Sequence, residues 1–280
     1  MKFDTYSEYD PRATSQTLPA FLTIWPGLGN YHDDLVLLGG MVPLYICNHP
    51  TGERALPRPA TLDVDFGISL GASAGQYGTL ATDLRAQGFR PSQQHAGRFE
   101  REVDGIPVYV DFLVEDGDQP RGTRMVDDVT ASVMPGVVRA LATARRVQVT
   151  GTDLYGARQS VMARVCGVGP FLMLKLRALL HRQQGKDAFD LLYTLLHYDG
   201  GTGAAIAAFA AEAKANNPAM PDARRALETL FADENAPGPV KAAHFVLGPI
   251  QVGESSGTAL RRQQVRQDMA FAAAELLRAL

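Results

Sequence analysis

The chain has 280 residues, of which 46% are hydrophobic and 20% are charged, and its formal net charge is −3. A chain of this length can bury a sizeable core in one or two domains, and no internal repeat or disordered low-complexity tract interrupts it. Its two cysteines fit neither a disulfide framework nor a zinc site, so we expect two buried thiols. No apolar run could span a bilayer and the first residues do not resemble a signal peptide, so we expect a cytoplasmic protein without membrane contact.

Basic residues are concentrated in one part of the chain. Residues 139–186 contain nine basic residues and one acidic residue, which is a net charge of +8. A basic surface of this kind would suit the phosphates of a nucleotide or the backbone of an RNA. The alternative is a solvated face on which charges happen to cluster.

The first third of the chain combines turns with one short buried segment. Residues 1–34 are polar and contain three prolines, so we expect an irregular lead-in. A strand is expected over 35–38 and a short helix over 41–46, with Gly39 and Gly40 between them. Glycines at such a turn let the backbone approach phosphates at a helix N-terminus. A loop is expected to follow the short helix.

Two aspartates, Asp63 and Asp65, lie on the next expected strand, over 61–70. Residues i and i+2 of a strand project from the same face, so both carboxylates can reach one point. Such carboxylates repel each other unless a cation lies between them, and oxygen ligands suit Mg²⁺, with Mn²⁺ as the alternative ion. The glycine turn and these acids together indicate nucleotidyl transfer. A small-residue turn is expected over 71–78 and a helix over 79–87.

The clearest β-hairpin is expected over 98–113, because an Asp-Gly pair separates two β-rich runs. A two-residue turn at this pair places Arg98 opposite Asp111. A carboxylate in an otherwise apolar strand needs a partner, which is either Arg98 alone or the metal ion held by the other two acids. We favour the metal ion, because a third acid from a neighbouring strand would complete the site.

The character of the chain changes to helix beyond about residue 160. Apolar residues at helical spacing predict helices over 171–183, ended by Gly185, and over 187–198. Further helices are expected over 203–215, 222–233, 238–247 and 258–279. The sequence therefore predicts an α/β or α+β chain with a mixed-sheet domain over residues 1–160 and a helical domain over 161–280.

Five stretches carry a resemblance to a known family. They are Gly39-Gly40, Arg58-x-x-Thr61-x-Asp63-x-Asp65, Val110-Asp111-Phe112-Leu113, Lys175-Leu176-Arg177-Ala178-Leu179 and Gly185-Lys186-Asp187-Ala188-Phe189-Asp190-Leu191-Leu192. In this order they resemble the AbiEii-type nucleotidyltransferases, which are toxins of abortive-infection and type IV toxin–antitoxin systems. The resemblance covers roughly residues 35–198. It implies a polymerase-β-like nucleotidyltransferase sheet with flanking helices, and a helical domain that contributes Lys and Asp motifs to the cleft.

The resemblance also implies a role for each matching residue of the first domain. Asp63 and Asp65 would bind Mg²⁺ on the triphosphate. Asp111 would assist a second metal ion or deprotonate the acceptor hydroxyl. Gly39 and Gly40 would offer backbone N–H groups to the phosphates.

In the helical domain, Lys175 would neutralise triphosphate charge and Lys186 would belong to the same nucleotide site. Asp187 or Asp190 would orient Lys175 or the base, and we prefer Asp190. Spacing alone gives other readings, a solvated helix lysine for Lys175 and a helix N-cap for Asp187. Lys175 and Arg182 are expected on one face of their helix.

The expected function is transfer of a nucleoside monophosphate from an NTP to an RNA such as a tRNA 3′ end, in a toxin with a possible cognate antitoxin partner. Relative to the family, the chain carries an insertion over 48–57, which could shape the acceptor site. Two alternatives stay open. One is nucleotidylation of a small hydroxylated molecule, as in aminoglycoside nucleotidyltransferases. The other is a non-catalytic binding protein that keeps the fold, against which the presence of all three acids argues.

Overall fold

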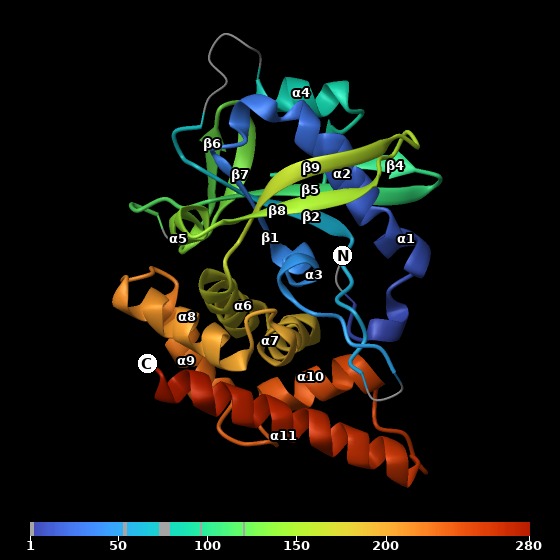
Figure 1. Cartoon of the computed structure of the whole chain (residues 1–280), viewed down its shortest axis with the longest axis vertical. Helices are drawn as coiled ribbons and strands as arrows, with labels where there is room; N and C mark the ends of the chain where they lie inside the picture. Colours follow the sequence, from blue (N-terminus) through green and yellow to red (C-terminus); the bar gives the residue numbers. More distant parts are fainter. Residues whose placement is uncertain (1–2, 53–54, 73–78, 96, 120) are drawn as a thin grey trace. The chain divides into compact units, whose positions relative to one another are not determined.

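The computed structural model describes residues 3–52, 55–72, 79–95, 97–119 and 121–280. The chain divides into two compact units, coloured along the sequence in Figure 1. The sheet unit consists of Asp10–Tyr45 and Thr61–Gly167, and the helical unit of Met1–Tyr9, Ile46–Ala60 and Val168–Leu280. The expected boundary at residue 160 falls inside a strand, and the structure instead changes unit between Gly167 and Val168.

The expected fold class is confirmed, because a mixed sheet is flanked by helices and followed by a helical region. The strands are β1 (Leu35–Leu38), β2 (Asp63–Ile68), β3 (Arg90–Pro91), β4 (Arg98–Val103), β5 (Ile106–Val114), β6 (Thr123–Val126), β7 (Val129–Val133), β8 (Arg145–Thr152) and β9 (Arg158–Val165). Their order is β3-β4-β5-β2-β1-β9-β8, and β7 pairs with both β5 and β6. Strand β2 is central, antiparallel to β1 and parallel to β5.

The helices of the sheet unit correct one expectation. They are α1 (Pro11–Ser15), α2 (Thr17–Gly27), α3 (Pro43–Ile46), α4 (Leu80–Ala86) and α5 (Val137–Ala142). The irregular lead-in expected over 1–34 is wrong, because its prolines are compatible with helix. Pro11 begins α1 after Asp10, whose side chain accepts a hydrogen bond from Arg12 N. Pro19 lies in the first turn of α2, where a missing N–H costs no intrahelical bond.

Strand alternation sorts the side chains of the sheet by face. Phe66 of β2 and Phe112 of β5 stack with ring centroids 5.9 Å apart, and Phe21 of α2 lies 6.1 Å from Phe66. Helix α2 also packs against β8 and β9, so it covers this face. Asp65 and Asp111 each adjoin one of these strand phenylalanines in sequence, and they therefore project from the opposite face.

The expected hairpin is confirmed in its register as well as its position. Arg98 on β4 pairs with Asp111 on β5, as the two-residue turn requires. The turn residues Asp104 and Gly105 have φ angles of 51° and 75°, and two consecutive positive φ values are what a type I′ turn needs. The helix expected before the hairpin is α4. Most of the turn expected over 71–78 lies outside the described residues.

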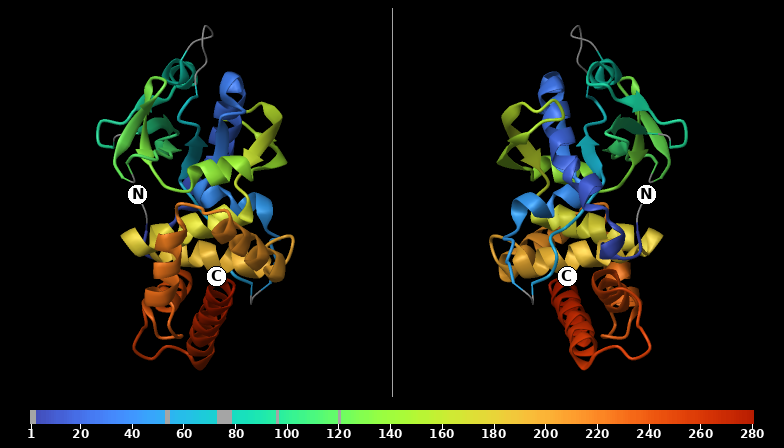
Figure 2. Two further views of the ribbon diagram at one scale, coloured as in Figure 1. Left: turned by 90° about the vertical axis from the view of Figure 1, so that its left-hand side faces the viewer. Right: turned by 90° about the vertical axis from the view of Figure 1, so that its right-hand side faces the viewer.

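The helical unit contains the remaining long helices. They are α6 (Val168–Arg182), α7 (Gly185–His197), α8 (Thr202–Lys214), α9 (Met220–Leu230), α10 (Pro237–Leu247) and α11 (Ser256–Arg278). Helices α10 and α11 pack together, and α10 also packs on α7 (Figure 2). Gly185 begins α7 rather than ending α6, which is followed by Gln183 in a left-handed conformation with φ 51°. Asp187 therefore lies in the first turn of α7 and is not its N-cap, which is Gln184.

The loop over 46–60 is attached to the end of α7. Cys47 forms an isolated β-bridge with Tyr198, and Asn48 N donates a hydrogen bond of 2.8 Å to His197 O. The insertion expected in this loop thus belongs to the helical unit, although it precedes β2 in sequence. Both cysteines of the chain are buried and form no disulfide, as expected.

Candidate functional site

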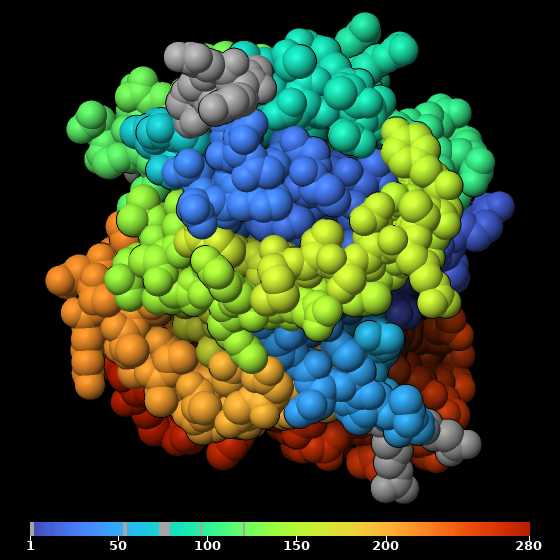
Figure 3. Space-filling view, turned by 45° about the horizontal axis from the view of Figure 1, so that its top comes forward, coloured from blue at the N-terminus to red at the C-terminus, as the bar shows by residue number. Residues whose placement is uncertain are grey.

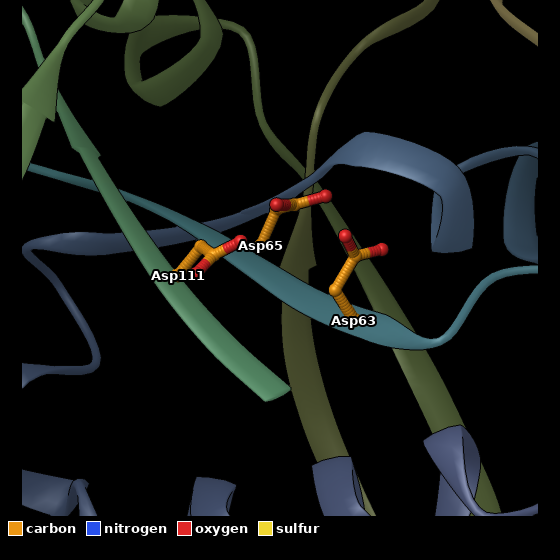
Figure 4. A group of neighbouring side chains, drawn as sticks. All are labelled: Asp63, Asp65 and Asp111. Atoms are coloured by element: carbon orange, nitrogen blue, oxygen red, sulfur yellow. The ribbon is translucent and has the colours of Figure 1, made fainter. Parts of the chain in front are cut away.

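Three carboxylates come together on one face of the sheet (Figure 4). Asp63 and Asp65 belong to β2, and Asp111 belongs to β5, where it is the register partner of Asp65. One oxygen atom from each carboxylate lies within 4.8 Å of the others, and all three residues are partly exposed. The convergence expected from strand geometry is therefore present, and the group is in partial contact with solvent.

The donor atoms of this group suit a hard divalent cation. Carboxylate oxygens are the ligands that Mg²⁺ prefers, and opposite oxygens of an octahedral Mg²⁺ shell are about 4.2 Å apart, which the spacing of the group can accommodate. Thr61 Oγ1 donates a hydrogen bond to Asp63 Oδ1 and so fixes the orientation of that carboxylate. Among the described residues, no other group of three or more His, Cys, Asp or Glu side chains is arranged to hold a metal ion.

A glycine makes room for one of the acids. Gly39 follows β1 and begins a short 3-10 helix, and its φ of +67° is in the left-handed region. A Cβ atom at this position would overlap Asp65 Oδ2. Leu38, the preceding residue, is the register partner of Asp65, so the turn and the acid are adjacent across the strand pair. Glycine is therefore needed at position 39 both for the positive φ angle and for the space that Asp65 occupies. The expected contact of Gly39 with phosphates stays a prediction.

The substitution Gly39→Ala is expected to displace the Asp65 carboxylate. A left-handed backbone conformation at alanine lowers the free energy of unfolding by about 1–2 kcal/mol. The overlap of the new Cβ atom with the Asp65 carboxylate should separately weaken divalent-ion binding by about tenfold or more. Gly105→Ala is the matched control, because Gly105 also has a positive φ, of +75°, but open space around its Cα. Urea unfolding and Mn²⁺ titration of both variants measure the two effects. Equal Mn²⁺ affinities would show that Gly39 does not position Asp65.

Arg98 brings a positive charge to the acids. Its Nε and Nη2 donate hydrogen bonds of 2.8 and 2.6 Å to Asp111 Oδ1 and Oδ2. Its Nη2 also lies 3.9 Å from Asp63 Oδ2. The hydrogen bonds to Asp111, with the negative charges of all three acids, hold the pKa of Arg98 above its ordinary value. Asp111 thus has Arg98 as a partner and also belongs to the acid group. The two partners considered for it, Arg98 and a metal ion, therefore do not exclude each other.

A second charged group lies inside the helical unit. Lys175 Nζ on α6 is 2.6 Å from Asp190 Oδ2 and 3.3 Å from Asp187 Oδ1, both on α7. Arg182 Nε is 2.6 Å from Asp187 Oδ2, and Lys186 Nζ is 2.6 Å from Asp190 Oδ2. Both aspartate side chains are completely buried. The expected pairing of Lys175 with these aspartates is present, and the reading of Lys175 as a solvated lysine is wrong.

Comparisons with known protein families, curated proteins and solved structures found no match. The family resemblance of the sequence therefore stays an expectation, and the geometry of the side chains carries the functional conclusion. In the described part of the chain, every helix is too short or too polar to cross a membrane.

The basic window over 139–186 is divided between the two units. Five of its basic residues lie in the sheet unit, and the other four lie in the helical unit and pair with carboxylates. These carboxylates belong to Asp187, Asp190 and Asp222, which follow the window in sequence. The net charge of the window alone therefore overstates its exposed positive charge.

Two contacts of these groups were not foreseen from the sequence. The contact between Arg98 and Asp63 depends on how β2 aligns with β5, which the hairpin pattern does not contain. The ion pair between Lys186 and Asp190 has i,i+4 spacing on α7, and this spacing was a usable signal. The burial of both aspartates depends on packing between helices, which no local pattern reveals.

Proposed function

We propose that the chain is a Mg²⁺-dependent nucleotidyltransferase. The observation that supports this proposal is the convergence of Asp63, Asp65 and Asp111 beside the turn at Gly39, on a mixed sheet. Displacement at a nucleotide α-phosphorus needs compensation of the triphosphate charge and a positioned acceptor hydroxyl. Three acids from two neighbouring strands, next to a glycine turn, are suitable groups for binding a charge-compensating metal ion and for positioning the acceptor hydroxyl.

Each acid has a defined part in this proposal. Asp63 and Asp65 would hold Mg²⁺, which would compensate negative charge on the triphosphate and on the pyrophosphate. A carboxylate oxygen of Asp111 accepts the proton of the acceptor hydroxyl. The hydroxyl oxygen then forms a bond to the α-phosphorus while the bond from that phosphorus to the bridging oxygen breaks. The products are the nucleotidylated acceptor and pyrophosphate.

The test is incubation of the purified full chain with Mg²⁺ and each α-labelled NTP. One set of reactions contains total RNA, and a second contains small hydroxylated acceptors such as aminoglycosides. The expected result is label in RNA together with pyrophosphate release for one preferred NTP. Label in a small molecule alone would replace RNA as the acceptor, and no product with any acceptor would contradict the proposed activity.

The acceptor that we propose is RNA, and the outer face of the β8–β9 hairpin supports it. A Cβ atom on Gly151 would meet Leu22 and Leu18 of α2, so the odd-numbered residues of β8 face that helix. Arg146 therefore faces away from α2, and so does Arg158, the register partner of Thr152. Both arginines are exposed, and β8 and β9 lie at the surface in Figure 3.

Reversal of both charges, Arg146→Glu with Arg158→Glu, is expected to weaken RNA binding and leave NTP binding unchanged. Loss of two phosphate contacts to single-stranded RNA lowers the slope of log affinity against log salt by about 1.4. The matched control is Arg85→Glu with Arg90→Glu, the same charge change at exposed positions of the same unit. Fluorescence anisotropy with RNA at several salt concentrations measures the difference. Equal affinities in the two variants would favour a small-molecule acceptor.

A further inference from the structure

Arg98 occupies the oxygen atoms that a metal ion would need on Asp111. Its guanidinium binds both of them, at 2.8 and 2.6 Å. Its Cζ atom also lies 4.5 Å from the ring centroid of Tyr109, which stacks on the guanidinium and limits its movement. The Arg98 side chain is only 13% exposed, so it is held among the residues of the site and does not extend into solvent.

We propose that Arg98 is an internal counter-ion that competes with a second divalent ion for Asp111. This inference rests on the proposed function, because it concerns the same acid group. In the nucleotide-free protein, one divalent ion binds through Asp63 and Asp65 while Arg98 holds Asp111. A second ion, and proton transfer to Asp111, both require the guanidinium to leave that carboxylate. Arg98 is thus a positioning residue that sets the metal content of the site.

The formal charges of the site agree with this division. The three acids and Arg98 by themselves sum to a formal charge of −2, which is the charge that one divalent ion neutralises. A second divalent ion in the nucleotide-free site would create excess positive charge within a few ångströms of the guanidinium. The phosphates of a bound NTP carry the negative charge that could attract Arg98 away from Asp111. Nucleotide binding and release of Asp111 are therefore coupled.

Mn²⁺ binding to the full-length protein without nucleotide tests the inference, by calorimetry and by paramagnetic resonance of the free ion. The wild type is expected to bind one ion. Arg98→Gln is expected to bind Mn²⁺ about tenfold more tightly and to admit a second ion, because the competing charge is gone. Arg98→Lys keeps a cation but loses the paired hydrogen bonds to both oxygens of Asp111, so its Mn²⁺ affinity and stoichiometry are expected to lie between those of the wild type and Arg98→Gln.

Arg101→Gln is the matched control, because Arg101 lies on the same strand and hydrogen-bonds Gln87 O and Tyr155 away from the acids. Its Mn²⁺ binding is expected to equal that of the wild type. Thermal melting gives a second readout. In EDTA the Arg98→Gln variant should melt below the wild type, because its acids have lost the positive charge of Arg98, and Mn²⁺ should raise its melting temperature by more.

The outcomes separate this inference from the proposed function. Equal Mn²⁺ affinity and stoichiometry in the wild type and Arg98→Gln overturn the competition and leave the metal site intact. No Mn²⁺ binding by either protein overturns both. If the glutamine variant does not fold, the number of Mn²⁺ ions bound by the wild type, with and without nucleotide, tests the inference. Two ions bound to the nucleotide-free wild type contradict the inference, and one ion, rising to two with a non-hydrolysable NTP analogue, supports it.

Discussion

The substitution Asp65→Asn is expected to abolish nucleotidyl transfer while leaving the fold intact. Asparagine has nearly the same shape as aspartate but carries no charge, so the site loses one anionic ligand. Removal of even an outer-shell partner of a bound metal costs about 10- to 100-fold in affinity or activity, so loss of a direct ligand should cost at least about 100-fold. The rate of label transfer from the preferred NTP at saturating Mg²⁺ measures this loss.

Stability distinguishes a catalytic aspartate from a structural one. Asp65 lies within 4.8 Å of two other carboxylates through its nearest oxygen atoms, so its neutralisation relieves like-charge repulsion. The free energy of unfolding in EDTA should therefore be unchanged or higher. Asp118→Asn is the control, because it makes the same charge change at an exposed position of the same unit. Full activity of Asp65→Asn would refute the proposed mechanism, and a large loss of stability would make Asp65 structural.

Local sequence signals were enough to predict the central part of the sheet. The Asp-Gly turn fixes the hairpin register, because a two-residue type I′ turn leaves one pairing for the flanking strands. That register places Arg98 opposite Asp111, as the structure shows. The i, i+2 spacing of Asp63 and Asp65 likewise determines that both project from one face of β2. These predictions depend on residues close together in sequence.

Predictions failed where distant segments decide the structure. Helix α2 contradicts the expected irregular lead-in, because its prolines are compatible with helix and its buried aromatic residues pack on the sheet. The change of unit lies later in the chain than residue 160, because β9 pairs with β1 of the sheet unit and ends only at Val165. The attachment of the 46–60 loop to α7 depends on contacts between residues about 150 positions apart, such as Asn48 and His197.

The candidate site shows the same division between local and distant information. The acids could be named from their strand positions, and the glycine turn from its place after β1. The state of Lys175 could not be deduced, because a helix lysine looks the same in sequence whether it is solvated or buried. In the structure its side chain is 7% exposed and paired with two aspartates of another helix. This burial favours a structural role for the group, which the resemblance assigns to nucleotide binding.

The substitution Asp190→Asn is expected to destabilise the protein by about 3 kcal/mol or more. Asp190 Oδ2 is 2.6 Å from both Lys175 Nζ and Lys186 Nζ, and its side chain is fully buried. Asparagine would leave two largely buried ammonium groups without this counter-ion, and removal of one partner from a buried ion pair costs about 3–5 kcal/mol. Urea unfolding, analysed with a common slope for both proteins, measures the loss.

Two further variants show whether this loss comes from uncompensated buried charge. Asp222→Asn is the control, because Asp222 pairs with Arg177 and His181 but is 31% exposed, so water can replace part of the lost charge and the expected loss of stability is smaller. Adding Lys186→Met to Asp190→Asn should restore part of the stability, because it removes one of the two buried ammonium groups that have lost their counter-ion. If Asp190→Asn instead has the same free energy of unfolding as the wild type and loses only nucleotidyl transfer, Asp190 acts on the substrate. Its ion pairs with the two lysines would then contribute little to the stability of the helical unit.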